Sequence, residues 1–144
     1  MKIAFASDHA GFAMKELVKT YVEKTRKFEI LDLGTYSEES VDYPIYGEKI
    51  GKAVAGGDAD LGIAVCGSGI GISIAANKVK GARCALCHSV EYAHMAKQHN
   101  NANILALGGR YTKAEEAYKI IDEWLDTEFE GGRHHRRVDE LDNL

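Results

Sequence analysis

A chain of 144 residues, 45% hydrophobic and 28% charged, has the composition of a single globular domain and enough length for a packed core. No apolar run reaches membrane-spanning length and the first residues enter an apolar strand, so we expect no signal peptide, no membrane partner and a cytoplasmic location. The net charge of -4 argues against a general nucleic-acid binder, and three cysteines, an odd number, argue against a disulfide framework.

Strands and helices alternate five times along the chain. The predicted strands cover residues 2–7, 28–33, 61–65, 82–86 and 103–107, which are short apolar runs closed by turn residues. The predicted helices carry apolar residues at helical spacing within 13–21, 46–54, 70–76, 90–98 and 117–125. Among their end signals are Ser89 as an N-cap, the capping box Thr112 to Glu115, and a glycine stop at Gly56 and Gly57.

This alternation predicts an α/β protein of three α/β/α layers, with a doubly wound five-stranded parallel sheet most like the flavodoxin order. Residues 1–144 then form one domain. A basic cluster at 131–137 opens a C-terminal tail, which we expect to be helical from Arg133 and to place Arg133 and Arg137 on one face. So short a helix needs support, so we expect the tail (131–144) to dock on this domain or on a second copy.

The stretch 60–77 is the most informative part of the chain. A buried strand ends at Cys66, and Gly67, Gly69 and Gly71 then form a turn that opens a helix. Such a turn lets backbone N–H groups approach an anion, and the helix N-terminus favours a thiolate beside it. The alternative is that Cys66 is a small buried hydrophobe and that the glycines only allow tight packing. The turn lacks the spacing of a dinucleotide fingerprint and the lysine of a P-loop.

Other polar residues follow neighbouring strands of the predicted sheet. Asp8 and His9, Cys66 with Ser68, and Arg110 come directly after strands, so we expect them at one edge. Each has a simpler explanation alone, since Asp8 can cap the first helix and Arg110 can pair with an acidic neighbour.

His99 and Asn100 close a helix before the fifth strand, which places them at the opposite edge of the sheet from Cys66. If they are catalytic, they serve a site on another subunit. The alternative is a polar helix C-cap, with Asn100 or Asn101 left-handed. Cys84 and Cys87 have the spacing of a redox or zinc pair, but residues three apart on a strand point to opposite faces.

A thiol, a hydroxyl and a row of N–H donors suit proton abstraction next to a carbonyl. Cys66 would take a carbon-bound proton, the N–H groups of Gly67, Ser68, Gly69, Ile70 and Gly71 would hold the enediolate, and Ser68 would pass protons between its oxygens. Arginines nearby suggest a phosphorylated substrate. The scheme requires no metal or other cofactor, and the sequence shows no cluster of histidines and carboxylates that would hold a metal.

Several motifs together resemble the B-type ribose-5-phosphate isomerases, in the wider family that includes galactose-6-phosphate isomerase subunits. The resemblance covers nearly the whole chain and is carried by residues 6–11 (Ala-Ser-Asp-His-Ala-Gly), 32–36, 41–44 (Val-Asp-Tyr-Pro), 66–78, 98–103 and 130–138. It implies interconversion of ribose 5-phosphate and ribulose 5-phosphate through an enediolate, by a homodimer or dimer of dimers whose sites lie between subunits.

The resemblance also assigns roles residue by residue. It makes Cys66 the base and Ser68, which is threonine in many members, the hydroxyl that assists proton transfer. It makes His99 the residue that opens the furanose ring and Asp8 a holder of sugar hydroxyls. The resemblance further implies that the open chain is bound by Asn100 and the turn 67–71. It implies that the phosphate is bound by His9, Arg110, Arg133 and Arg137.

Two other functions stay open. Cys66 separates the chain from the branch with a glutamate base, and His99 with the arginine tail favours the ribose enzyme over the galactose subunits, but a six-carbon aldose phosphate such as allose 6-phosphate needs the same chemistry. A non-catalytic phosphosugar-binding module would keep the phosphate contacts without turnover.

Overall fold

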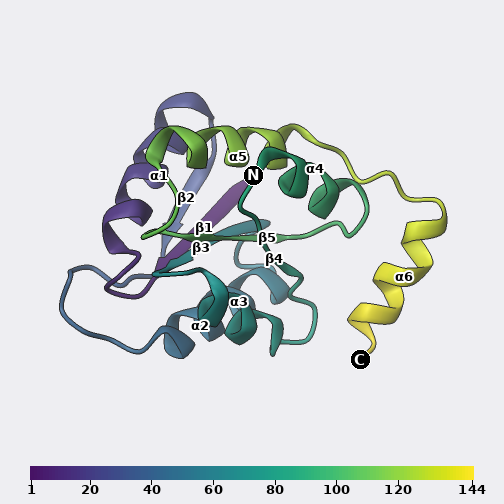
Figure 1. Cartoon of the computed structure of the whole chain (residues 1–144). Coiled ribbons are helices and arrows are strands. Elements are labelled where there is room, and N and C mark those ends of the chain that lie inside the picture. Colours follow the sequence, from purple (N-terminus) through teal and green to yellow (C-terminus); the bar gives the residue numbers. More distant parts are fainter.

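In the computed structural model, which describes residues 1–144, five parallel strands form one sheet in the order β2-β1-β3-β5-β4 (Figure 1). The strands are β1 (Lys2–Ser7), β2 (Glu29–Asp32), β3 (Leu61–Cys66), β4 (Cys84–Leu86) and β5 (Ile104–Gly108). Helices α1 (Phe12–Thr25), α4 (Val90–Gln98) and α5 (Ala114–Asp126) cover one face, and α2 (Tyr43–Ala55) and α3 (Ile70–Asn77) cover the other. The predicted three-layer, doubly wound fold is confirmed.

The strand order departs from the flavodoxin order in its last two members, because β5 lies between β3 and β4. Burial explains the exchange. Every residue of β5 is buried, as expected for a strand with neighbours on both sides, whereas the three residues of β4 are only partly buried and suit an edge. Right-handed crossovers then require α4, which connects β4 back to β5, to lie on the same face as α1.

Two switch points flank β3. The chain leaves β1 through α1 towards β2, but it leaves β3 through α3, on the opposite face, towards β4. The connection after β5 leads into α5, on the same face as α1. Where the connections after two neighbouring strands leave on opposite faces, a crevice opens at the carboxyl ends of those strands. The loop after β3 therefore lies between two such crevices, one beside β1 and one beside β5.

The helix ends are mostly those predicted. The Ser89 hydroxyl accepts the N–H of Tyr92 at 3.2 Å, which confirms it as an N-cap, and α2 ends at Gly56 as expected. The predicted capping box is wrong. The helix α5 begins at Ala114 with Lys113 at the N-cap position and no side-chain cap, because the turn that follows β5 extends through Thr112.

A buried ammonium ties α1 to the loop after β2. Lys15 has no exposed surface, and its Nζ donates to Asp32 Oδ1 at 2.7 Å and to the Thr35 carbonyl at 2.8 Å. Lys19 Nζ bonds the other oxygen of Asp32 at 2.7 Å. Burial works to raise the pKa of Asp32, but hydrogen bonds from Lys15 and Lys19 outweigh it and hold that pKa below its ordinary value.

Replacing Asp32 with alanine is expected to lower the free energy of unfolding by about 3 kcal/mol, because the Lys15 charge stays buried without its main partner. Because the native pKa of Asp32 is depressed, the contribution is present at neutral pH and is lost as pH falls through that pKa. Urea unfolding at neutral pH measures the loss. Glu29→Ala, which removes the exposed 3.8 Å pair with Lys2, is the control; an equal loss in both variants would contradict the account.

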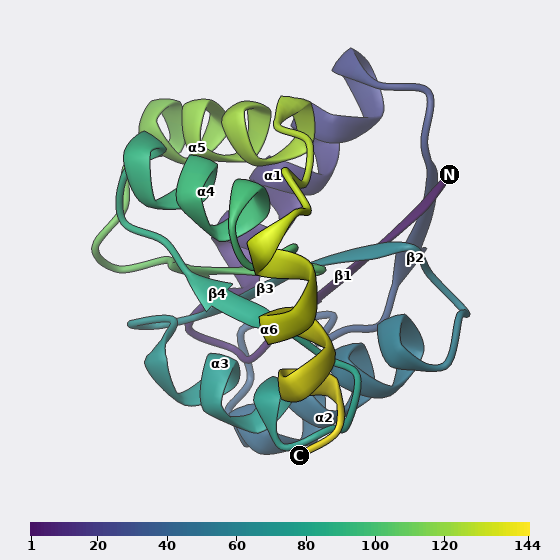
Figure 2. The same ribbon diagram turned by 90° about the vertical axis from the view of Figure 1, so that its right-hand side faces the viewer.

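The C-terminal helix α6 (Arg133–Asp142) lies beyond the β4 edge of the sheet (Figures 1 and 2). His134 and Val138 are its buried residues, while Arg133 and Arg137 are exposed. An ion pair of 2.8 Å between Arg83 and Asp142 holds its far end to the segment before β4. None of the helices has both the length and the apolar character required to cross a bilayer.

Candidate active site

A cavity of about 520 Å³ lies where the loops after β1, β3 and β5 meet. This is an ordinary size for a small-molecule site. Its lining contains eight residues predicted for the site, namely Asp8, His9, Cys66, Gly67, Ser68, Ile70, Gly71 and Arg110, together with Ala10, Tyr43, Ile74 and Tyr111. The prediction that polar residues at the strand ends share one edge is thus confirmed.

Cys66 is the last residue of β3, and only 4% of its surface is exposed. The Gly69 N–H donates to its Sγ at 3.2 Å. The thiol therefore combines restricted access to water with a backbone N–H donor, and it lines the cavity where a base for a carbon-bound proton is needed.

The glycines of the turn are needed for close approach. Gly69 has φ of +80°, and a Cβ there would lie 2.5 Å from Leu86 and 2.9 Å from the Leu107 carbonyl carbon. A Cβ on Gly71 would lie 2.5 Å from the Tyr43 ring. The packing explanation of these glycines is therefore correct, and it is compatible with function, because the same packing holds the turn against the cavity.

The loop after β5 is bonded to the glycine turn. The N–H groups of Gly109 and Arg110 donate to the carbonyls of Cys66 and Gly67 at 2.9 and 3.0 Å. A Cβ on Gly67 would lie 3.2 Å from Arg110 Nη1, so the guanidinium rests against the turn. The Ser68 hydroxyl accepts the Ile70 N–H at 3.1 Å and lines the same cavity. A cation, a hydroxyl and a thiol thus face one space.

Asp8 and His9 complete this side of the cavity. Asp8 is 6% exposed, and its Oδ1 accepts the Gly11 N–H at 3.0 Å, so the carboxylate shapes the turn before α1 and also lines the cavity. His9 Nδ1 lies 3.1 Å from the Val41 nitrogen and 3.2 Å from the Val41 carbonyl oxygen, so the loop before α2 holds the ring beside the cavity.

Gly69 belongs to the same turn but does not line the cavity, and four predicted residues lie elsewhere: His99, Asn100, Arg133 and Arg137. Gly108, the last residue of β5, pairs with Cys66, whereas His99 precedes β5, so the strand, about 13 Å long, separates them. His99 is the C-cap of α4 and Asn101 has φ of 47°, so the alternative reading as a polar C-cap is also correct.

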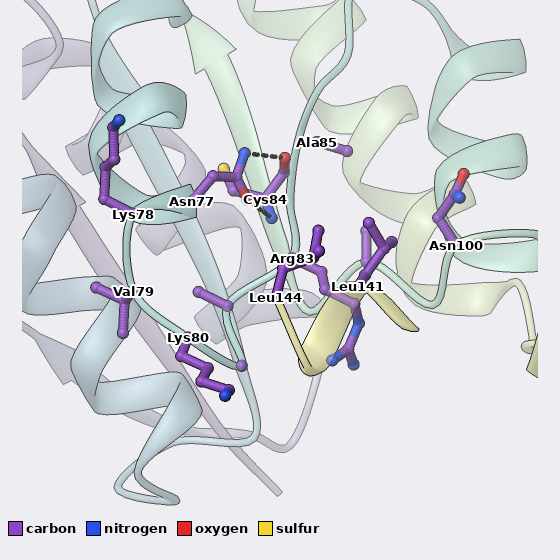
Figure 3. A pocket seen from close by; sticks show the side chains of 13 residues that line it. Asn77, Lys78, Val79, Lys80, Arg83, Cys84, Ala85, Asn100, Leu141 and Leu144 are labelled. Atoms are coloured by element: carbon purple, nitrogen blue, oxygen red, sulfur yellow. Dashed lines mark hydrogen bonds between the residues drawn. The ribbon is translucent and has the colours of Figure 1, made fainter. Parts of the chain in front are cut away.

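Asn100 borders a second cavity of about 490 Å³ beside β4, with Leu141 and Leu144 of the tail (Figure 3). In this view Arg83, from the segment before β4, lies beside the two leucines of the tail. This cavity contains none of the residues around Cys66. Within one chain, Asn100 is therefore separated from the predicted site residues around Cys66.

Two tyrosines of the first cavity were missed from sequence. Tyr43 packs on Gly71 and Tyr111 follows Arg110. The motif Val-Asp-Tyr-Pro that contains Tyr43 contributes to the family resemblance, but no role was predicted for it.

The expectation of no clustered histidine and carboxylate ligands is wrong, because His99, Glu130 and His134 converge near α6. The three residues are far apart in the sequence, so no local pattern indicates a cluster. The tail brings Glu130 and His134 next to His99 at the end of α4.

Cys84 and Cys87 lie on opposite faces of the sheet, as predicted for a strand. Burial raises the pKa of Cys84 to about 12, with a further contribution from Cys87, and burial raises the pKa of Cys87 to about 11.

Iodoacetamide at neutral pH is therefore expected to modify Cys66, which lines the cavity, before the other two thiols, which stay protonated until pH approaches their raised pKa values. Mass spectrometry of peptides from samples taken over time measures the order of labelling. Modification of Cys84 or Cys87 before Cys66 would contradict the prediction.

The model of the family described as Ribose/Galactose Isomerase matches residues 3–141. The chain is 48% identical over 141 residues to ribose-5-phosphate isomerase B of Escherichia coli (strain K12), over 97% of this chain and 93% of the relative. The ribose-5-phosphate isomerase B structure from Clostridium thermocellum has a TM-score of 0.97 at 48% identity, covering 99% of this chain and 96% of that one. The Mycoplasma genitalium enzyme with bound ribulose-5-phosphate has a TM-score of 0.92 at 41% identity, covering 99% and 94%. The chain belongs to the ribose/galactose isomerase family.

Proposed function

We propose that this protein interconverts D-ribose 5-phosphate and D-ribulose 5-phosphate, as an aldose-ketose isomerase of the pentose phosphate pathway. The observation that carries the proposal is the buried Cys66 thiol, which lines a cavity with an arginine and accepts a backbone N–H. The relatives named as ribose-5-phosphate isomerase B, one of them holding ribulose-5-phosphate, support this choice of substrate. The metabolic role corresponds to a cytoplasmic location.

The reaction begins at the open-chain aldehyde. Cys66 thiolate takes the proton from C2, and the electron pair of that C–H bond forms the C1–C2 double bond as negative charge moves to the carbonyl oxygen. N–H groups of the turn 67–71 donate to this oxyanion, and each such donor is worth about 3 to 4 kcal/mol in comparable sites. Ser68 passes a proton between the two oxygens, and Cys66 returns its proton to C1, which gives the ketose.

The phosphate and the sugar ring need groups from two chains. His9 and Arg110 face the cavity and bind the phosphate from one side. Arg133 and Arg137 are exposed on α6 of the same chain, away from this cavity, so those of a second copy complete the phosphate site in a homodimer. The second copy also supplies His99, which opens the furanose ring, and Asn100, which binds the open chain, while Asp8 holds sugar hydroxyls.

Turnover of ribose 5-phosphate and allose 6-phosphate, measured side by side with a chelator present, tests the substrate. We expect turnover of both to depend on the thiol and the five-carbon sugar to be preferred. A preference for allose 6-phosphate would replace the proposal with the six-carbon reading. Phosphosugar binding without turnover of either would indicate a binding module.

A further inference from the structure

A cluster of metal-binding groups lies where the tail meets the end of α4. Glu130 Oε2 lies 3.9 Å from His99 Nε2 and 3.8 Å from His134 Nε2, and the three atoms all lie within 4.8 Å of one another. The Glu130 N–H donates to the Gln98 carbonyl at 3.0 Å, which fixes this part of the tail beside His99. Parts of the chain distant in sequence thus converge on one point.

His134 is the most informative member. Only 8% of its surface is exposed, and its Nε2 is buried without a hydrogen-bond partner while it faces the Glu130 carboxylate. A buried polar atom without a partner costs free energy, which a ligand to that atom recovers.

We propose that His99, Glu130 and His134 bind a divalent transition metal, with Zn²⁺ as the best fit, and that the metal inhibits the enzyme. Two imidazoles and one carboxylate form a known three-ligand set for zinc, and imidazole selects such metals over Mg²⁺ and Ca²⁺. The inhibitory part rests on the proposed function, because a metal on His99 Nε2 removes the group that opens the sugar ring.

The distances require a small adjustment. Tetrahedral ligands at zinc bond lengths lie about 3.4 Å apart, so the two contacts of Glu130 must shorten by about half an ångström. The ring nitrogens of His99 and His134, which lie within 4.8 Å of each other, must approach by up to about 1.4 Å. The His99 and His134 rings are stacked, with centroids 4.4 Å apart and planes 12° apart, so one ring must also tilt. The side chains of Glu130 and His99 are 48% and 28% exposed and have room to move.

Charge limits the affinity. The positive charges of Arg133 and Arg137 act on His134, and they oppose a cation in the same way. Glu130 supplies a single compensating charge. We therefore expect binding in the micromolar range, well below the affinity of a structural zinc site.

Titration of the chelator-stripped protein with Co²⁺, followed by visible absorption, and with Zn²⁺, followed by calorimetry, tests the site without substrate. We expect one metal per chain, no sulfur-to-cobalt charge-transfer band, and at least about a tenfold loss of affinity in both Glu130→Gln and His134→Gln. His135→Gln is the matched control, because His135 is an exposed neighbour on α6 that pairs with Asp139 at 3.2 Å, and it should bind as wild type does.

Absence of binding, unchanged affinity in the two variants, or a sulfur-to-cobalt band would overturn the proposed metal site.

The inhibition is tested by turnover of ribose 5-phosphate. Zn²⁺ should slow turnover by the wild type, and a chelator should restore it. Half-inhibition of Glu130→Gln should require at least about ten times more Zn²⁺. Equal sensitivity of Glu130→Gln would overturn it. Binding is measured without substrate and basal turnover with chelator, so failure of the metal site and failure of the isomerase proposal give different results.

Discussion

Cys66→Ala is expected to lower kcat for ribose 5-phosphate by about 10³-fold or more, because general bases contribute up to about 10⁴-fold and no other side chain in the cavity replaces the thiolate. The Kd of a phosphosugar should change only a few-fold, since we propose that His9 and the arginines, not Cys66, bind the phosphate. Steady-state kinetics with calorimetric binding of the same sugar measures both quantities.

Cys84→Ala is the matched control for this experiment. Cys84 is a thiol of the same sheet, but it borders the cavity beside β4 and its raised pKa keeps it protonated. It should keep nearly full activity. Turnover by Cys66→Ala at a rate close to wild type would remove Cys66 from the role of base.

His99→Asn is expected to lower kcat/KM for cyclic ribose 5-phosphate by about 100-fold, because ring opening loses its proton-transfer group. Conversion of ribulose 5-phosphate, which has no ring to open, should fall only a few-fold, and its open-chain product closes without the enzyme. Initial rates in both directions measure the difference.

His94→Asn serves as the control for His99→Asn. His94 lies on the same helix and also contacts a carboxylate, Glu123 Oε2 at 2.9 Å, but it lines neither cavity. It should change neither rate. Equal losses in the two directions for His99→Asn would contradict a ring-opening role and would indicate a general effect on substrate binding.

The alternation of apolar runs and amphipathic segments was sufficient to predict the layers and the parallel sheet. The order of the last two strands was not predicted, although the sequence held a signal. The fully apolar run in β5 and the three-residue β4 after Arg83 indicate a central and an edge strand respectively. The error came from assigning neighbours by chain order rather than by the burial that each strand requires.

The half of the site around Cys66 was predictable because residues after parallel strands meet at one edge whatever the loop details. Tyr43 was not, because it reaches the cavity from the start of α2, and only packing against Gly71 places it there. The cluster of His99, Glu130 and His134 depends on how a tail with little apolar surface folds back. No local pattern in the sequence encodes that contact.

The central claim is that one active site takes Cys66 from one chain and His99 from another. Mixing inactive Cys66→Ala with impaired His99→Asn, after unfolding and refolding together, tests it most directly with ribose 5-phosphate as substrate. Half of the dimers then combine the two variants and carry one intact site of two, so about a quarter of wild-type activity should return. Activity no higher than the sum of the two separately refolded variants would show that the two residues do not act across a subunit interface.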